Sequence, residues 1–185
     1  MPSLVITGAS SGIGHATAKH FAEAGFTVIN LSRGTCDVAS VINISCDLTD
    51  PDFMSRIESD LNAGIEDAKT ICLVHNAARL AHDSVADVSA SDLRSVYEIN
   101  LIAPAVLNRA LLPAMAVGSS ILYVGSTLGE KAVPGSFSYV TSKHATIGMM
   151  RATCQDLAGS GVHTACINPG FTDTEMLRDH IPADV

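Results

Sequence analysis

Three side chains in the second half of the chain, Ser126, Tyr139 and Lys143, are of types that take part in proton transfer. Tyr139 and Lys143 are four positions apart, so on a helix they share one face about one turn apart. A free phenol has a pKa of about 10, too high for a group that must donate and accept a proton near neutral pH. An ammonium about 4 Å away favours the phenolate by roughly 4 kcal/mol at an effective dielectric constant of about 20. The spacing therefore predicts a Tyr139 pKa of about 7.

Each of these residues also has an ordinary structural explanation. A serine after a strand is typical of a turn, a tyrosine of a half-buried core position, and a lysine of a solvated helix face. Asn100 alone is typical of a helix kink. Their joint placement on the ligand side of one predicted sheet favours chemistry, in which Ser126 hydrogen-bonds a substrate oxygen.

A glycine-rich turn over residues 7–14 connects a short apolar strand, 3–6, to a helix that begins beside Gly12. Glycines 8, 12 and 14 remove side chains where the turn is tight, where a diphosphate touches backbone, and where helix lies close on sheet. The helix N-terminus offers unpaired N–H groups to an anion. This Gly-x-x-x-Gly-x-Gly spacing differs from the usual dinucleotide fingerprint and by itself also fits a turn without ligand.

Apolar strands alternate with helices along the whole chain. We expect strands at 3–6, 27–31, 41–45, 70–74, 120–124 and 162–167. Only about nine residues separate the second and third strands, too few for a full crossover helix. The pattern predicts an α/β fold with a Rossmann-type doubly wound parallel sheet, in three layers, as a single domain over residues 1–185.

Three helices have local signals in the sequence. Asp50 and Pro51 are expected as N-cap and first residue of one helix, and Ser89 begins a capping box for a longer one. Pro104 lies inside that longer helix, where it should bend the helix and leave the carbonyl of Asn100 free. A further helix is expected over residues 139–158.

Composition limits the classes of partner. The chain of 185 residues is 47% hydrophobic and 16% charged, which is enough for one well-buried domain. A net charge of -8 argues against nucleic acid and against an acidic membrane surface. Without a span-length apolar run or a secretory signal, we expect a cytoplasmic protein.

Cysteine and histidine spacing gives no support to a metal site. The five cysteines form no C-x-x-C pair, and most lie in apolar segments, so they are expected to be buried reduced thiols. The seven histidines are scattered without ligand spacing.

A set of motifs spread over nearly the whole chain carries a resemblance to a known family. They are Thr7-Gly8-x-x-x-Gly12-x-Gly14, Asp47-Leu48, Asn76-Ala77-Ala78, Asn100, Ser126, Tyr139-x-x-x-Lys143 and Pro169-Gly170. Together they resemble a short-chain dehydrogenase/reductase of the single-domain oxidoreductase type. That resemblance implies hydride transfer between a nicotinamide cofactor and a small carbonyl or alcohol substrate.

The resemblance also implies roles for individual residues. Tyr139 would be the catalytic acid/base, Lys143 would lower its pKa and hold the nicotinamide ribose, and Ser126 would orient the substrate. Asn100 would position a water of the proton relay. The implied cofactor contacts are Gly8, Ser10, Ser11, Gly12, Ile13 and Gly14 at the diphosphate, Asp47 and Leu48 at adenine, Asn76, Ala77 and Ala78 along the adenosine ribose, and Pro169, Gly170, Thr172 and Thr174 at the nicotinamide amide and phosphate.

The end of the second strand bears on the choice of cofactor. The resemblance implies an acidic residue at this position in family members that use NAD, whereas this chain has Ser32 and Arg33. A guanidinium binds a 2'-phosphate, and no carboxylate is present there to repel it, so NADP(H) is favoured over NAD(H). The alternative is that Arg33 is a solvated loop residue.

The sequence departs from the family pattern at two places. His75 and Ala78 replace the more usual asparagine and glycine around Asn76-Ala77. The chain also ends at Val185, so the usual C-terminal strand and substrate lid are expected to be mostly missing.

Two other functions are alternatives to the enzyme. A sensor or scaffold protein that binds NADP(H) without turnover would not need Ser126 and Tyr139. An epimerase or dehydratase relative is disfavoured by the glycine spacing and by the short chain. The resemblance further implies a homodimer or homotetramer, paired through the small and apolar residues of the helices at 100–115 and 139–158.

Overall fold

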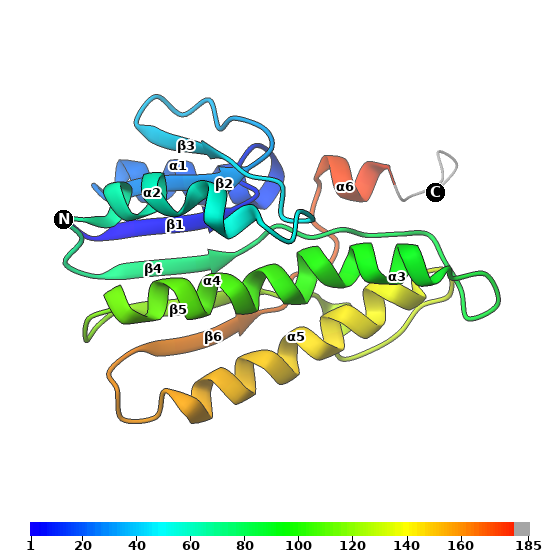
Figure 1. Cartoon of the computed structure of the whole chain (residues 1–185). Coiled ribbons are helices and arrows are strands. Elements are labelled where there is room, and N and C mark those ends of the chain that lie inside the picture. Colours follow the sequence, from blue (N-terminus) through cyan, green and yellow to red (C-terminus); the bar gives the residue numbers. More distant parts are fainter. Residues whose placement is uncertain (180–185) are drawn as a thin grey trace.

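Six parallel strands form one sheet in the order β3-β2-β1-β4-β5-β6 (Figure 1). In the computed structural model, which describes residues 1–179, they are β1 (Ser3–Thr7), β2 (Thr27–Ser32), β3 (Val41–Ser45), β4 (Ile71–His75), β5 (Ser120–Val124) and β6 (His163–Ile167). The strand order reverses between β1 and β4, which is where doubly wound sheets bind ligands. The predicted Rossmann-type fold is confirmed; residues 180–185 of the predicted domain lie outside the described residues.

Helices cover both faces of this sheet and make three layers (Figure 1). One face carries α2 (Phe53–Ile65), α4 (Ala103–Leu111) and α5 (Phe137–Asp156), and the other carries α1 (Gly12–Glu23). The remaining helical elements are α3 (Ala90–Tyr97), a π-helical turn (Glu98–Ile102), two 3₁₀ turns (Leu112–Ala114 and Thr127–Gly129) and α6 (Glu175–Arg178). As expected, the chain between β2 and β3 forms no helix.

The core follows from the apolar strands. All five residues of β1 are buried, and successive side chains alternate between the two faces, with Val5 in the cluster under α2, α4 and α5 and Leu4 in the cluster under α1. The helix cover on the α1 side ends before β6, where Ile167 is 57% exposed. The prediction of cover on both faces therefore holds for the central strands and not for this edge strand.

The expected start of α2 is wrong by two residues. Asp50 uses its carboxylate to accept the N–H of Asp52 at 3.0 Å, and its carbonyl accepts the N–H of Phe53 at 3.0 Å. These bonds close a turn over Pro51, so the N-cap is Asp52 and the helix begins at Phe53.

The helix expected after Ser89 consists of α3, the π-helical turn and α4. Ser89 caps α3 by accepting the N–H of Asp92 at 3.0 Å, as predicted. Ahead of Pro104 the chain adopts the π-helical turn, in which the N–H of Ala103 bonds the carbonyl of Glu98 five residues back. A π turn is one of the ways in which a helix accommodates a missing donor.

A buried polar chain links β4, α4, β5 and α5. His75 Nε2 donates to Asn108 Oδ1 at 2.7 Å, the Asn108 amide donates to the hydroxyl of Tyr123 at 2.7 Å, and that hydroxyl lies 3.0 Å from Thr153 Oγ1. Within residues 1–179, His75 Nδ1 has no hydrogen-bond partner. Burial lowers the pKa of His75 to about 4, although its bond to Asn108 acts in the opposite direction.

This neutral histidine should make the fold sensitive to acid. Between its ordinary pKa and about 4, the unfolded chain binds a proton that the folded chain excludes, so stability falls as pH falls. From pH 7 to pH 5, His75 should cost about 2 kcal/mol of unfolding free energy. Between pH 7 and pH 5, the unfolding free energy of His75→Asn, measured in urea, should fall by about 2 kcal/mol less than that of the wild type. Equal losses in both proteins would refute a neutral buried His75 as the cause.

The described residues contain neither a membrane-spanning helix nor a cluster of metal ligands. None of the helices in residues 1–179 is long and apolar enough to cross a membrane. The same stretch holds no group of three or more His, Cys, Asp or Glu side chains that is arranged to bind a metal ion.

Candidate active site

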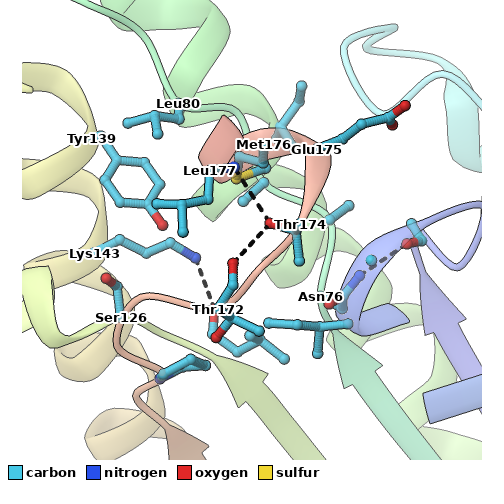
Figure 2. A pocket seen from close by; sticks show the side chains of 18 of the residues that line it. Asn76, Leu80, Ser126, Tyr139, Lys143, Thr172, Thr174, Glu175, Met176 and Leu177 are labelled. Carbon is cyan, nitrogen blue, oxygen red and sulfur yellow. Dashed lines mark hydrogen bonds between the residues drawn. The ribbon is translucent and has the colours of Figure 1, made fainter. Parts of the chain in front are cut away.

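A cavity of about 910 Å³ lies over the carboxyl ends of the strands. It brings together the loops after β1, β2, β3, β4, β5 and β6 with the first turns of α5 and the segment that leads into α6. All predicted site residues line it except Asn100 and Gly14. Figure 2 shows Ser126, Tyr139 and Lys143 on one side of the cavity, Asn76 on the other, and Thr172 and Thr174 between them.

The glycine turn after β1 is built for close backbone approach. Gly8 has φ +71°, and a Cβ there would lie 3.0 Å from the Cα of Ala77. A Cβ on Gly14 would lie 2.5 Å from the amide nitrogen of Asn76 and closer still to the carbonyl oxygen of Gly8. Asn76 in turn donates to the carbonyls of Thr7 and Gly8 at 3.0 and 2.9 Å. Gly14 therefore packs α1 against the turn and lies behind the cavity lining.

Tyr139 and Lys143 share one face of α5, as their spacing predicted. Lys143 Nζ lies 5.5 Å from the centroid of the Tyr139 ring and donates to the carbonyl of Val124 at 2.7 Å. Ser126 follows β5, its Oγ accepts the N–H of Leu128 at 3.1 Å, and its hydroxyl acts to lower the pKa of Tyr139. The three side chains belong to two neighbouring elements and meet at one end of the cavity (Figure 2).

The expected low pKa of Tyr139 is wrong for this structure. Burial raises the pKa of Tyr139, and the hydrogen bond with Ser126 only partly offsets this effect. The prediction assumed a fully charged ammonium next to the phenol. Burial lowers the pKa of Lys143 to about 8, and its Nζ points to the Val124 carbonyl rather than to the phenol oxygen.

Asn100 is buried beside α5. Its Oδ1 accepts the N–H of Arg79 at 2.8 Å, and its Nδ2 donates to the carbonyl of Arg79 at 3.2 Å and to Ser142 Oγ at 2.9 Å. Ser142 links Asn100 to the backbone of Tyr139, because its hydroxyl donates to the carbonyl of Tyr139 at 2.8 Å. The side chain thus fixes the loop after β4 to α5, and the water-binding role of its carbonyl stays a prediction.

The loops after β2 and β3 form the far end of the cavity. Ser32, Arg33, Asp47 and Leu48 all line it. Hydrogen bonds from the N–H and hydroxyl of Thr49 lower the pKa of Asp47, and the charge of Arg33 lowers it further. The exposed Arg33 guanidinium thus faces the cavity, and the Asp47 carboxylate is close enough for this charge to lower its pKa.

The segment after β6 crosses the cavity opening. The carbonyl of Pro169 accepts the N–H of Thr127, which joins this segment to the loop after β5. A Cβ on Gly12 would lie 3.2 Å from Thr174 Cγ2, so the same segment reaches the glycine turn. Thr174 then caps α6 through the N–H of Leu177. Both sides of the cavity are therefore connected by residues 169–177.

Many other residues of the cavity lining belong to no sequence motif. These mostly apolar residues are Leu80, His82, Ile99, Leu128, Lys131, Val133, Pro134, Phe171, Met176 and Leu177, together with Gly34, Cys46, Thr127, Gly135, Ser136 and Glu175. They come from loops without periodicity or a short motif. Only the structure shows that they share a cavity with Tyr139.

Known proteins resemble this chain over nearly all of its length. The sequence model of the short chain dehydrogenases matches residues 3–184. Protein FixR of Bradyrhizobium diazoefficiens is 32% identical over 197 residues, which cover 98% of this chain and 71% of that protein. The 1-deoxy-11-beta-hydroxypentalenate dehydrogenase of Streptomyces exfoliatus is 30% identical over 94% of this chain and 68% of its own length.

A solved structure has the same fold. The 4-hydroxyisoleucine dehydrogenase complexed with NADH superposes with a TM-score of 0.84 at 27% identity, over 96% of this chain and 79% of that one. The fold and the crevice at its strand ends define a Rossmann-type α/β protein. The chain belongs to the short-chain dehydrogenase/reductase family, as the match over residues 3–184 establishes.

Proposed function

We propose that this protein is an NADP(H)-dependent oxidoreductase that interconverts a carbonyl compound and an alcohol. The observation that carries the proposal is the convergence of Ser126, Tyr139 and Lys143 at one end of a cavity that the glycine turn also lines. Membership of the family and a relative named as a dehydrogenase support it. The solved structure of a similar dehydrogenase with NADH supports a nicotinamide cofactor.

The cavity suits a dinucleotide at the glycine turn. The helix α1 begins at Gly12, and its N-cap, Ser11, makes no side-chain cap bond among the described residues, so that N–H groups stay available for a diphosphate. Ser10, Ser11 and Gly12 would hold that diphosphate, Lys143 the nicotinamide ribose, and residues 169–174 the nicotinamide amide. When bound, the nicotinamide supplies or accepts the hydride.

The proton would be handled by Tyr139. Burial keeps its phenol protonated at neutral pH, so that in carbonyl reduction it can donate a proton to the substrate oxygen. Ser126 would hold that oxygen by a hydrogen bond. Lys143 has a pKa of about 8 and is therefore mostly charged at pH 7, where its ammonium would stabilise the phenolate that is left behind. Apolar neighbours such as Leu80 and Leu177 would limit water at this end.

The preference for NADP(H) is supported by the loop after β2. Arg33 is exposed in the cavity lining, and the neighbouring Ser32 carries no charge that would repel a phosphate. Asp47 competes for the same guanidinium, which would moderate the preference.

Arg33→Ala should separate the two cofactors. We expect the variant to weaken NADPH binding by about 10- to 100-fold, the loss of a charge-assisted bond, and NADH binding by less than about twofold. Fluorescence titration of both cofactors measures this. Arg56→Ala is the matched control, because Arg56 pairs with Asp50 at 3.1 Å outside the cavity lining. Equal losses for NADPH and NADH would remove Arg33 from the cofactor site.

The activity itself is tested by NADPH oxidation with a panel of ketones and aldehydes. Turnover that depends on Tyr139 would support the enzyme. Tight NADPH binding without turnover of any compound would instead support the sensor or scaffold protein. The substrate is proposed as a small carbonyl or alcohol compound, and no nucleic acid or membrane partner is proposed.

Location and assembly stay predictions. A cytoplasmic location was inferred from the sequence alone. A homodimer or homotetramer is supported by small and apolar side chains that α5 and the turn before α4 expose, such as Ala145, Ala152 and Ile102.

A further inference from the structure

The first turn of α5, which carries Tyr139, is held by a residue that the sequence did not single out. We propose that Asp83, in the loop between β4 and α3, is a positioning residue that caps α5 from outside and sets the place of the Tyr139 hydroxyl. The inference rests on the proposed function, because it concerns how the proposed proton donor is aligned. Asp83 acts through the helix backbone and does not line the cavity.

Asp83 satisfies two successive N–H groups at the start of α5. Its carbonyl accepts the N–H of Phe137 at 3.1 Å, and its Oδ1 accepts the N–H of Ser138 at 2.9 Å. Its own N–H donates to the carbonyl of Gly135 at 3.2 Å, so the loop and the helix start run side by side as a short parallel bridge. Both Asp83 and Ser138 are buried, which shields these bonds from water.

The helix needs this external cap because its own N-cap residue does not provide one. Ser136 makes no side-chain cap hydrogen bond within the described part of the chain. The first N–H groups of a helix have no partner inside it, and a carboxylate beside them also stabilises the helix dipole. A neighbouring loop therefore supplies what the local sequence lacks.

The cap lies next to the proposed proton donor. Tyr139 follows Ser138 directly, so a shift of the first turn moves its ring. Lys143, one turn further on, is anchored separately by the Val124 carbonyl, and Ser142 is held by Asn100. Loss of the Asp83 cap should thus displace Tyr139 relative to Lys143 and Ser126 rather than move the whole site.

The bonding of Asp83 is also unusual for a residue that only stabilises the fold. Its Oδ2 and the hydroxyl of Ser138 are both buried and without a hydrogen-bond partner among residues 1–179. A buried unpaired oxygen lowers stability, and such costs are typical of functional sites. The geometry favours alignment of the first turn as the reason for a carboxylate here.

The test compares Asp83→Ala, Asp83→Asn and Asp87→Ala. Asp87 lies in the same loop and bonds the N–H and hydroxyl of Ser84 instead of α5, so it is the matched control. We expect Asp83→Ala to lower kcat by about 10- to 100-fold, as for a small displacement of a catalytic group, with KM and the NADPH dissociation constant changed by less than about twofold. Asp83→Asn keeps the acceptor oxygen and should recover most of kcat, and Asp87→Ala should match the wild type.

A second measurement needs no turnover. Hydrogen–deuterium exchange of the peptide that spans residues 136–140 should be faster in Asp83→Ala than in the wild type and unchanged in Asp87→Ala. A lower Tm with unchanged kcat at 20 °C, or unchanged exchange in a folded Asp83→Ala protein, would overturn the proposal, and so would a folded Asp83→Asn protein whose kcat is as low as that of Asp83→Ala. If the wild type itself shows no turnover, the proposed function fails, and the exchange experiment still decides whether Asp83 caps α5.

Discussion

Tyr139→Phe should lower kcat for carbonyl reduction by about 100- to 10,000-fold, the usual contribution of a positioned proton donor. The variant keeps the buried ring and loses only the hydroxyl, which is the group proposed to protonate the substrate oxygen. The NADPH dissociation constant should change by less than about twofold, because Lys143 and the glycine turn are untouched. Steady-state kinetics together with cofactor titration measures both quantities.

Tyr97→Phe is the matched control for this result. The Tyr97 hydroxyl donates to Thr141 Oγ1 at 3.1 Å and lies outside the cavity lining. Its removal should leave kcat unchanged and cost about 1 kcal/mol of stability, the usual value of one hydrogen bond. If Tyr139→Phe and Tyr97→Phe had the same small effect on kcat, Tyr139 would not be the proton donor.

Gly14→Ala should damage the fold and the proposed cofactor site together. An added Cβ would lie 2.5 Å from the Asn76 amide and closer to the Gly8 carbonyl, so α1 must move away from the turn. We expect a loss of about 1–3 kcal/mol in unfolding free energy, typical of an overpacked site. Because the displaced groups shape the turn proposed to hold the diphosphate, NADPH affinity should fall as well.

Gly148→Ala makes the same substitution at a position without close neighbours, and it should have the opposite effect on stability. A Cβ there would meet nothing within 4 Å on the surface of α5, so alanine should stabilise that helix by about 1 kcal/mol through its higher propensity. Urea unfolding of both variants gives the comparison. A Gly14→Ala protein as stable as the wild type, with normal NADPH binding, would contradict the packing role of this glycine.

The fold was predictable because the signals for it are local. The apolar runs predicted the bounds of all six strands to within one residue, and the short connection at 33–40 correctly excluded a helix. The boundary at α2 was not predictable, because Asp50 can either cap a helix or close a turn over Pro51, and its bond to Asp52 decided for the turn.

The site was predictable where it depends on spacing and not where it depends on tertiary contacts. Tyr139 and Lys143 share a face because they are four apart on one helix. The prediction for the pKa of Tyr139 was wrong in direction. Burial raises this pKa, and Lys143 donates to the Val124 carbonyl instead of to the phenol oxygen. Sequence spacing reveals neither effect. Asp83 was missed since its link to α5 joins positions 55 residues apart.

The most direct test of the account uses NADPH in which both hydrogens at C4 of the nicotinamide are replaced by deuterium. With a reducible ketone or aldehyde from the panel, the wild-type protein should place deuterium on the carbinol carbon of the product, as mass spectrometry detects, and Tyr139→Phe should do so far more slowly. If NADPH binds tightly but the label reaches no member of the panel, the proposed hydride transfer is contradicted.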